Sequence, residues 1–194
     1  VNDAVPDGME SRPGLRVGNR LWLIGGSAVH WDHKSKRICY YDLEHPAKGW
    51  QDATVTGSDG FAARMGHACV VVDDSTLWVM GGLGPYECLA DVWQFKIGSN
   101  RDTLHGTELK ASSEWKPRCL FSAVNFNGLI WVGGGVSAPN GKALGDLWST
   151  PSSTTSWTPR PKGKLEYVVA NAIGTGMAFC DKTLFTMVTN RTGG

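Results

Sequence analysis

Short runs of alternating hydrophobic and polar residues, separated by turn residues, follow one another along the chain. Runs such as "HACVVVDD" from His67 and "GMAFCD" from Gly176 have a period of two, which is typical of strands with one buried face. Hydrophobic residues at helical spacing between capping residues are missing throughout. The pattern therefore predicts an all-β protein made of many short strands.

One strand-like segment recurs and ends on two glycines. Its three complete copies read "RLWLIGG", "TLWVMGG" and "LIWVGGG", and their tryptophans, Trp22, Trp78 and Trp131, lie 56 and 53 residues apart. A degenerate fourth copy, "TLFTMVT", begins at Thr183 and lacks the glycines. A repeat of this length indicates an array of similar structural units.

Further strand-like runs surround each complete copy. An alternating run precedes the later copies, and "RICYYDL", "ADVWQFK" or "GDLWSTP" follows. A short segment with a lone tryptophan comes next, at Trp50, Trp115 and Trp157. Each unit thus consists of four short antiparallel strands, and four-stranded units at a period near fifty are typical of propeller blades.

These units resemble the repeats of the kelch family, in which a diglycine closes the second strand, an aromatic residue lies in the third and a tryptophan in the fourth. The resemblance covers nearly the whole chain and implies a kelch-type β-propeller. In such a blade, glycine permits close approach and unusual dihedral angles at the strand end. The tryptophans fill the wedge between adjacent sheets. The run "DLWSTPSSTTSW" is more similar to bacterial kelch-type proteins than to animal adaptors.

We expect a single propeller domain over residues 1–194 that forms a partial ring or part of a larger propeller. Its expected blades lie at about 12–53, 64–116 and 118–160, with a partial blade at about 165–194. An open ring leaves sheet faces and edges uncovered. Three arrangements remain open: a piece of a larger propeller, pairing with a second chain, or a four-bladed ring in which Val1–Met9 completes the last blade.

Charge and composition exclude several classes of partner. Nineteen basic and eighteen acidic residues give a net charge of +1, so we expect no nucleic-acid partner. No apolar run approaches the length of a membrane span, so we expect no membrane partner. Five scattered cysteines without a CxxC pair argue against a disulfide framework or a zinc ribbon and favour reduced, structural thiols. No phosphate-binding loop is present, and we expect no cofactor.

The order of strands predicts where a ligand binds. In up-and-down blades, the loop between the second and third strands emerges on the same face as the linker to the next blade, for example 54–66. Functional residues concentrate in such loops, and the resemblance implies that this face binds peptides or small ligands. The expected ligand-binding residues are His30, Trp31, Arg64, Tyr86, Arg118, Arg160 and Tyr167.

Two interpretations apply to the three arginines Arg64, Arg118 and Arg160, each of which precedes an expected inner strand. Arginines repeated around the mouth of the channel would bind carboxylates through bidentate pairs. Alternatively, they brace the linkers by donating hydrogen bonds to loop carbonyls. The resemblance implies that acidic peptides or acidic sugars are the ligands. Asp91 and Asp146 recur at the start of a third strand and indicate a structural turn bond.

The loop "HWDHKSKR" contains His30, Asp32 and His33, whose side chains are of the types that bind metals. Without a distant fourth ligand, we interpret it as a solvated loop with no metal. Trp31 is a candidate platform for stacking on a sugar or a peptide. His67 follows a glycine, and the resemblance favours a structural hydrogen bond over a catalytic role for it.

The leading hypothesis is a binding or scaffold propeller that recognises a protein segment or a carbohydrate on the loop face. One alternative is a carbohydrate-active enzyme similar to sialic-acid mutarotases or polysaccharide lyases, for which we assign no catalytic residue. The other is a structural subunit that completes a ring, with a second chain or the missing remainder supplying the other blades.

Overall fold

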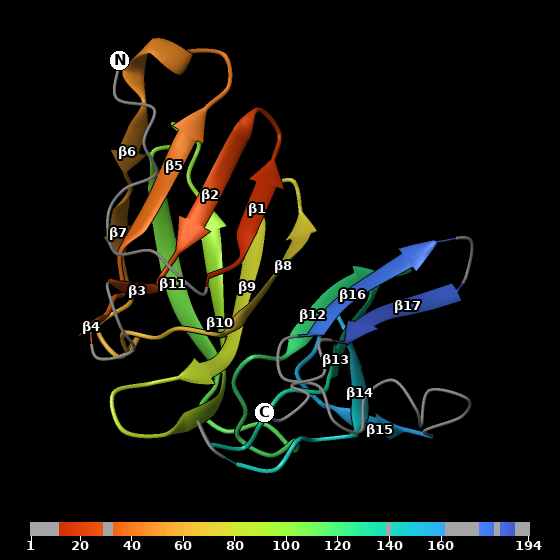
Figure 1. Ribbon diagram of the computed structural model, residues 1–194. Coiled ribbons are helices and arrows are strands. Elements are labelled where there is room, and N and C mark those ends of the chain that lie inside the picture. Colours follow the sequence, from red (N-terminus) through yellow and green to blue (C-terminus); the bar gives the residue numbers. More distant parts are fainter. Residues whose placement is uncertain (1–11, 29–32, 139–140, 162–174, 181–182, 189–194) are drawn as a thin grey trace.

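The computed structural model describes residues 12–28, 33–138, 141–161, 175–180 and 183–188. In this part of the chain, strands form three consecutive sheets and a final hairpin (Figure 1), and the one helical segment is the short 3₁₀-helix η1 (Pro46–Lys48). The architecture confirms the all-β prediction. No helix of the described residues is long and apolar enough to span a membrane.

The first sheet has the spatial order β1-β2-β5-β6, and all its neighbours are antiparallel. Its strands are β1 (Gly14–Val17), β2 (Arg20–Ile24), β5 (Ile38–Asp42) and β6 (Trp50–Asp52). Trp22 lies at the centre, opposite Leu15 on one side and Tyr40 on the other. Between β2 and β5 the chain forms a small hairpin of β3 (Ser27–Ala28) and β4 (His33–Lys34).

The second sheet has five strands rather than four. Its antiparallel strands are β8 (Ala68–Asp73), β9 (Thr76–Leu83), β10 (Cys88–Ile97) and β11 (Thr103–Lys110). A fifth strand, β7 (Thr54–Thr56), comes from the preceding linker and pairs in parallel with β11 at the outer edge. The linker 54–66, which the sequence predicted to be a loop, therefore begins with a strand that covers an exposed sheet edge.

The third sheet again has four antiparallel strands in sequence order. They are β12 (Ser122–Phe126), β13 (Leu129–Gly133), β14 (Leu147–Pro151) and β15 (Thr158–Arg160). A two-stranded hairpin of β16 (Thr175–Cys180) and β17 (Thr183–Val188) follows. Because its two strands pair along their whole length, the degenerate fourth copy of the repeat does form a strand.

The first strands of successive sheets are neighbours, β1 next to β8, β8 next to β12, and β12 next to β16 (Figure 1). Such a row of sheets is the arrangement of propeller blades around an axis. The described strands form no closed ring. The four-bladed closure depends on residues 1–9, which lie outside the described residues.

The repeated tryptophans occupy equivalent positions in the three sheets. Trp22 and Trp78 are 1% and 2% exposed and pack in the two hydrophobic clusters that join the first sheet to the second and the second to the third. Trp131 has the same register in the third sheet, opposite Val124 and Ser149. Large aromatic side chains thus fill the wedge between twisted sheets, as the repeat predicts.

The diglycines are required for the backbone conformation and for close approach. Gly82 has φ +96°, and a Cβ there would lie 2.6 Å from the Cβ of His67. Gly135 has φ +84°, and a Cβ there would lie 2.6 Å from the Cβ of Phe121. Any other residue would be strained at these dihedral angles and would collide with the first strand of its own sheet.

Candidate functional site

Backbone hydrogen bonds bring the linkers and the ends of the second strands to one face. The amide of Gly26 donates to the carbonyl of Arg64 at 2.9 Å, and that of Gly82 donates to the carbonyl of Arg118 at 2.9 Å. Met65 and Leu83 exchange two further bonds, at 3.1 and 2.8 Å. Each linker therefore lies against the diglycine of the preceding sheet, and the loops share a face.

Arg64 is fully buried within this face and its donors are used inside the protein. Its Nη1 and Nη2 donate to the two carboxylate oxygens of Asp91 at 2.7 and 2.6 Å, and Nη1 also donates to the carbonyl of Gly81 at 2.9 Å. Its Nε donates to the carbonyl of Ala62 at 3.1 Å. The indole Nε1 of Trp93 donates to the same carboxylate at 3.0 Å, and this bond fixes the orientation of the Asp91 side chain.

Arg118 repeats this arrangement one sheet later. It donates to the two oxygens of Asp146 at 2.8 and 2.7 Å and to the carbonyl of Gly134 at 3.0 Å, while Trp148 donates to Asp146 at 2.7 Å. Burial alone would raise the pKa of Asp146, but the hydrogen bonds and charge of Arg118 outweigh it and hold that pKa below its ordinary value. The carboxylate therefore stays ionised beside its arginine.

The two arginines thus match the second interpretation, in which they brace the linkers. Neither Arg64 nor Arg118 exposes any side-chain surface, so neither guanidinium is available to a ligand carboxylate. Arg160 is not their equivalent, which corrects the prediction. It lies within β15, opposite Leu147, and its Nε donates to Ser149 Oγ at 2.7 Å.

The other predicted site residues fall into two groups. Tyr86 lies at the tip of the β9–β10 hairpin with 97% of its surface exposed. His30, Trp31 and Tyr167 lie outside the described residues. The described structure therefore places Tyr86 on the loop face but does not bring it into contact with the buried arginines.

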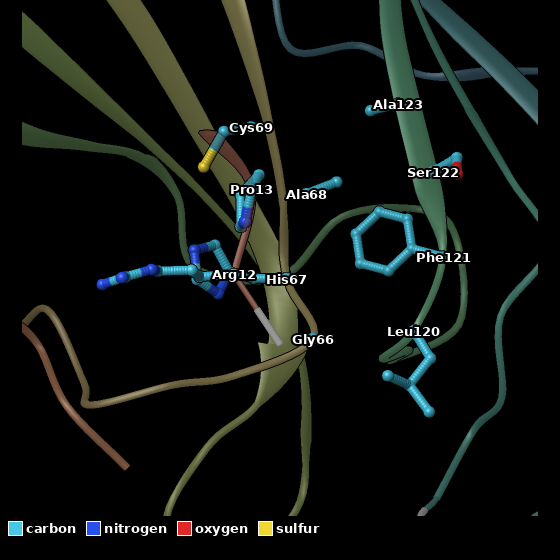
Figure 2. A pocket seen from close by; sticks show the side chains of 10 residues that line it. All are labelled: Arg12, Pro13, Gly66, His67, Ala68, Cys69, Leu120, Phe121, Ser122 and Ala123. Carbon is cyan, nitrogen blue, oxygen red and sulfur yellow. The ribbon is translucent and has the colours of Figure 1, made fainter. Parts of the chain in front are cut away.

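A cavity of about 380 Å³ opens where β1, β8 and β12 begin. Residues from the start of β8 and residues from the start of β12 face each other across it (Figure 2). The residues that line it are Arg12, Pro13, Gly66, His67, Ala68, Cys69, Leu120, Phe121, Ser122 and Ala123. The cavity thus lies between first strands, where the channel of a propeller runs, and its walls are mostly apolar.

Among the described residues that line this cavity, Arg12 is the cationic one. Its Nη1 is buried without a hydrogen-bond partner among the described residues. Burial lowers the pKa of its guanidinium, and the nearby charge of Arg37 lowers it further against an opposing effect of Cys39. An unpartnered nitrogen on a cation that burial has partly desolvated is poised to donate to an anion.

The register explains why the first sheet differs from the others. Ile38 pairs with Ile24, as Val92 pairs with Met80 in the second sheet. Arg37, which precedes Ile38, therefore occupies the position of Asp91 and Asp146 in the other sheets. The first sheet thus has an arginine where the other two sheets have the aspartate of the buried ion pair. This arginine, Arg37, pairs instead with the exposed Asp52.

Sequence reasoning missed Arg12 because its equivalence to residues of the other sheets depends on strand register. The repeated tryptophans pair with Leu15, Val70 and Val124 in the first strands. Three residues before these partners lie Arg12, His67 and Phe121, which are therefore equivalent positions. The prediction aligned arginines with arginines instead. Strand register, not residue identity, defines equivalent positions in successive sheets.

His67 also lines the cavity, but its imidazole is uncharged near neutral pH. Burial lowers its pKa to about 3, and the charge of Arg64 contributes in the same direction. A histidine that stays neutral down to this pH does not act as a general acid near neutrality. It packs closely against Gly82, whereas the structural hydrogen bond that the resemblance favoured stays a prediction.

One group of side chains has the spacing of metal ligands. Ligand atoms of Asp42, Glu44 and His45 lie within 4.8 Å of one another, which is the single such cluster among the described residues. The Asp42 carboxylate already accepts from Arg20 at 3.5 Å and contacts His45 Nδ1 at 3.3 Å. The cluster is thus an acidic turn whose central carboxylate is shared by two neighbouring side chains.

Comparisons with known proteins give the family. A family model described as the KLHDC2/KLHL20/DRC7 Kelch-repeats domain matches residues 12–188. The chain is 29% identical over 153 residues to Adagio protein 3 of Arabidopsis thaliana, covering 74% of this chain and 24% of that protein. It is 29% identical over 135 residues to the flagellar outer-arm dynein alpha chain of Chlamydomonas reinhardtii, covering 68% of this chain and 3% of that protein.

Adagio-like protein 1 of Oryza sativa subsp. japonica is 26% identical over 152 residues, which cover 74% of this chain and 23% of that protein. The chain thus spans a quarter or less of the length of these relatives. They are eukaryotic proteins, whereas the tryptophan-containing run 146–157 was interpreted as bacterial in type. The diglycine strands, the repeated tryptophans and the match over most of the sequence agree, and the chain belongs to the kelch-repeat family.

Proposed function

We propose that this chain binds a carboxylate-bearing segment of a partner protein in the cavity where β1, β8 and β12 begin. Membership of the kelch-repeat family supports a protein-binding or scaffold role. The observation that carries the finer proposal is Arg12, whose Nη1 is buried at the cavity without a partner among the described residues. We therefore assign to Arg12 the carboxylate-binding role expected of the arginines at the channel mouth.

The distribution of charge supports an anionic ligand at this corner. Arg64 and Arg118 are neutralised by their own aspartates inside the protein. Next to the first sheet, Arg37 lies close enough to Arg12 for its charge to lower the pKa of Arg12, although Arg37 is itself paired with the exposed Asp52. An incoming carboxylate would accept from Arg12 Nη1, and a hydrogen bond to a charged group contributes about 1.5–3 kcal/mol.

The size and walls of the cavity favour a short extended segment. About 380 Å³ accommodates a few side chains. Pro13, Leu120 and Phe121 offer apolar contacts around the guanidinium. Tyr86 supplies an outer contact from its exposed hairpin tip, and His30, Trp31, Arg160 and Tyr167 remain proposed ligand contacts.

An array of peptides with paired variants tests the proposal. Each acidic peptide is displayed beside its Asn/Gln and C-terminally amidated counterparts, and the chain is compared with its Arg12→Ala variant. We expect acidic peptides to bind the unaltered chain and to lose about 10- to 100-fold in affinity with the variant.

Arg16→Ala is the matched control because it removes the same charge from β1, four residues further along the chain. Arg16 does not line this cavity and donates from its Nε to the carbonyl of Gly18. Equal binding of amidated and acidic peptides, or equal losses in the two variants, would refute the carboxylate site. Glycans printed on the same array test the carbohydrate alternative directly.

We also propose that a further blade covers the outer face of the first sheet, whether from a second chain or from the rest of a longer one. Leu21 and Leu23 are only partly buried there, whereas Leu77 and Val79, their equivalents in the second sheet, are 0% exposed. A hollow of about 460 Å³ borders these leucines and Trp50. Measuring the mass in solution tests pairing, and a strictly monomeric chain would exclude a second copy.

A further inference from the structure

Two cysteines from neighbouring sheets meet near the loop face. Cys88 begins β10 in the second sheet, and Cys119 lies in the linker that enters the third sheet. Both belong to one small hydrophobic cluster with Met65, Leu83 and Val136, and they are 4% and 1% exposed. The cluster is separate from the two large ones that contain the tryptophans.

Hydrogen bonds hold the two thiols together. The Cys88 and Cys119 side chains are hydrogen-bonded to each other, and Cys88 Sγ donates to the carbonyl of Val136 at 3.8 Å. The backbone amide of Cys119 donates to this same carbonyl at 3.0 Å, and the amide of Val136 returns a bond to Cys119 at 2.9 Å. The carbonyl of Val136 therefore holds both cysteines near each other at the interface between the second and third sheets.

The hydrogen bond makes the two thiols chemically unequal. The bond from Cys119 lowers the pKa of Cys88, although burial opposes this effect, and the same bond together with burial raises the pKa of Cys119. Cys88 also follows directly on the exposed hairpin tip of Pro85, Tyr86 and Glu87, while its own side chain is buried. We therefore assign Cys88 as the nucleophile of the pair.

We propose that Cys88 and Cys119 form a reversible disulfide when the protein is exposed to hydrogen peroxide, and that this disulfide links the second sheet to the third. The Cys88 thiolate attacks one peroxide oxygen, the O–O bond breaks, and with one proton the products are Cys88 sulfenic acid and water. Cys119 sulfur then attacks the sulfenic sulfur, and the hydroxyl leaves with the Cys119 proton as a second water. Two thiols are oxidised and one hydrogen peroxide is reduced to two waters.

The bond would join two parts of the loop face that are otherwise linked by non-covalent contacts. Cys119 is followed by Leu120 and Phe121, which line the cavity, and Cys88 anchors the hairpin that carries Tyr86. Oxidation therefore locks the cavity wall to the hairpin. Any effect on ligand affinity rests on the proposed function, whereas formation of the disulfide does not.

Peptide mapping of the full chain tests the disulfide. The folded protein is treated with dilute hydrogen peroxide, free thiols are alkylated, and the chain is cleaved without reduction by trypsin and a glutamate-specific protease. Cleavage after Glu87 separates Cys88 from Cys69, and cleavage after Arg118 isolates the peptide that begins at Cys119. We expect a Cys88–Cys119 linked pair that has lost two hydrogen atoms and that reverts with dithiothreitol.

Three single variants complete the experiment. Cys88→Ala and Cys119→Ala should each abolish the linked peptide, while Cys69→Ala should retain it because Cys69 lies in a different cluster. Mapping of the unaltered chain needs no variant, so a variant that fails to fold leaves the test intact. The proposal would be overturned if both Cys88 and Cys119 are found alkylated after peroxide treatment of the folded chain. It would also be overturned if either cysteine is linked to a different cysteine.

Discussion

The Asp91→Ala substitution tests whether the buried arginines hold the linkers in place. Arg64 has no exposed side-chain surface and makes both of its short ionic contacts with Asp91. Removing the carboxylate leaves a guanidinium that is buried next to carbonyls without its counter-ion. It also removes the acceptor of the Trp93 indole.

The expected loss is large because an unpaired buried charge is costly. Breaking a buried ion pair by removing one partner destabilises proteins by about 3–5 kcal/mol. A domain's free energy of unfolding is about 5–15 kcal/mol, so the change removes a large share of it. For a chain of this length, the same loss lowers Tm by about 10 °C.

Urea unfolding followed by tryptophan fluorescence measures this loss, because tryptophans line the interfaces between sheets. Asp52→Ala serves as the control, since its ion pair with Arg37 has side chains that are 62% and 43% exposed, and we expect a cost of about 0–1 kcal/mol. The double variant Arg64→Met with Asp91→Leu should recover most of the stability, because it leaves no buried charge. An Asp91→Ala variant as stable as the control would refute the reasoning.

Three further predictions concern the diglycine, the loss of stability at low pH and the hairpin tip. Gly82→Ala should destabilise far more than Gly128→Ala: both have positive φ, but only at Gly82 does a Cβ collide with the protein; equal costs in urea unfolding would show that φ alone matters. Because the Asp146 pKa is lowered in the folded state, its stabilisation is present above the unfolded value of 3.8 and is lost as pH falls through the folded pKa; Asp146→Asn should flatten this acid decline, and an unchanged pH slope would contradict the assignment. Tyr86→Ala should leave Tm unchanged, because the side chain is 97% exposed, and should weaken binding of the acidic peptides; a large fall in Tm would show that the ring packs on the protein.

The sequence by itself predicted the class of fold and the repeated unit. Alternation with period two identifies strands, and the repetition of the tryptophans and diglycines identifies equivalent positions in successive sheets. Both signals are local because side-chain alternation and the dihedral freedom of glycine are properties of a few neighbouring residues. The family followed from these signals without any knowledge of contacts between distant residues.

Only the tertiary structure decided which arginines are available to a ligand. Arg64 and Arg118 meet their aspartates across 27 and 28 residues, while Arg12 Nη1 has no hydrogen-bond partner among the described residues and Arg37 occupies the acidic position in its sheet. The addition of β7 to the second sheet and the meeting of Cys88 with Cys119 likewise depend on distant segments. Charge pairing, edge covering and thiol contact are set by distances in space, and a linear pattern of residue types does not contain those distances.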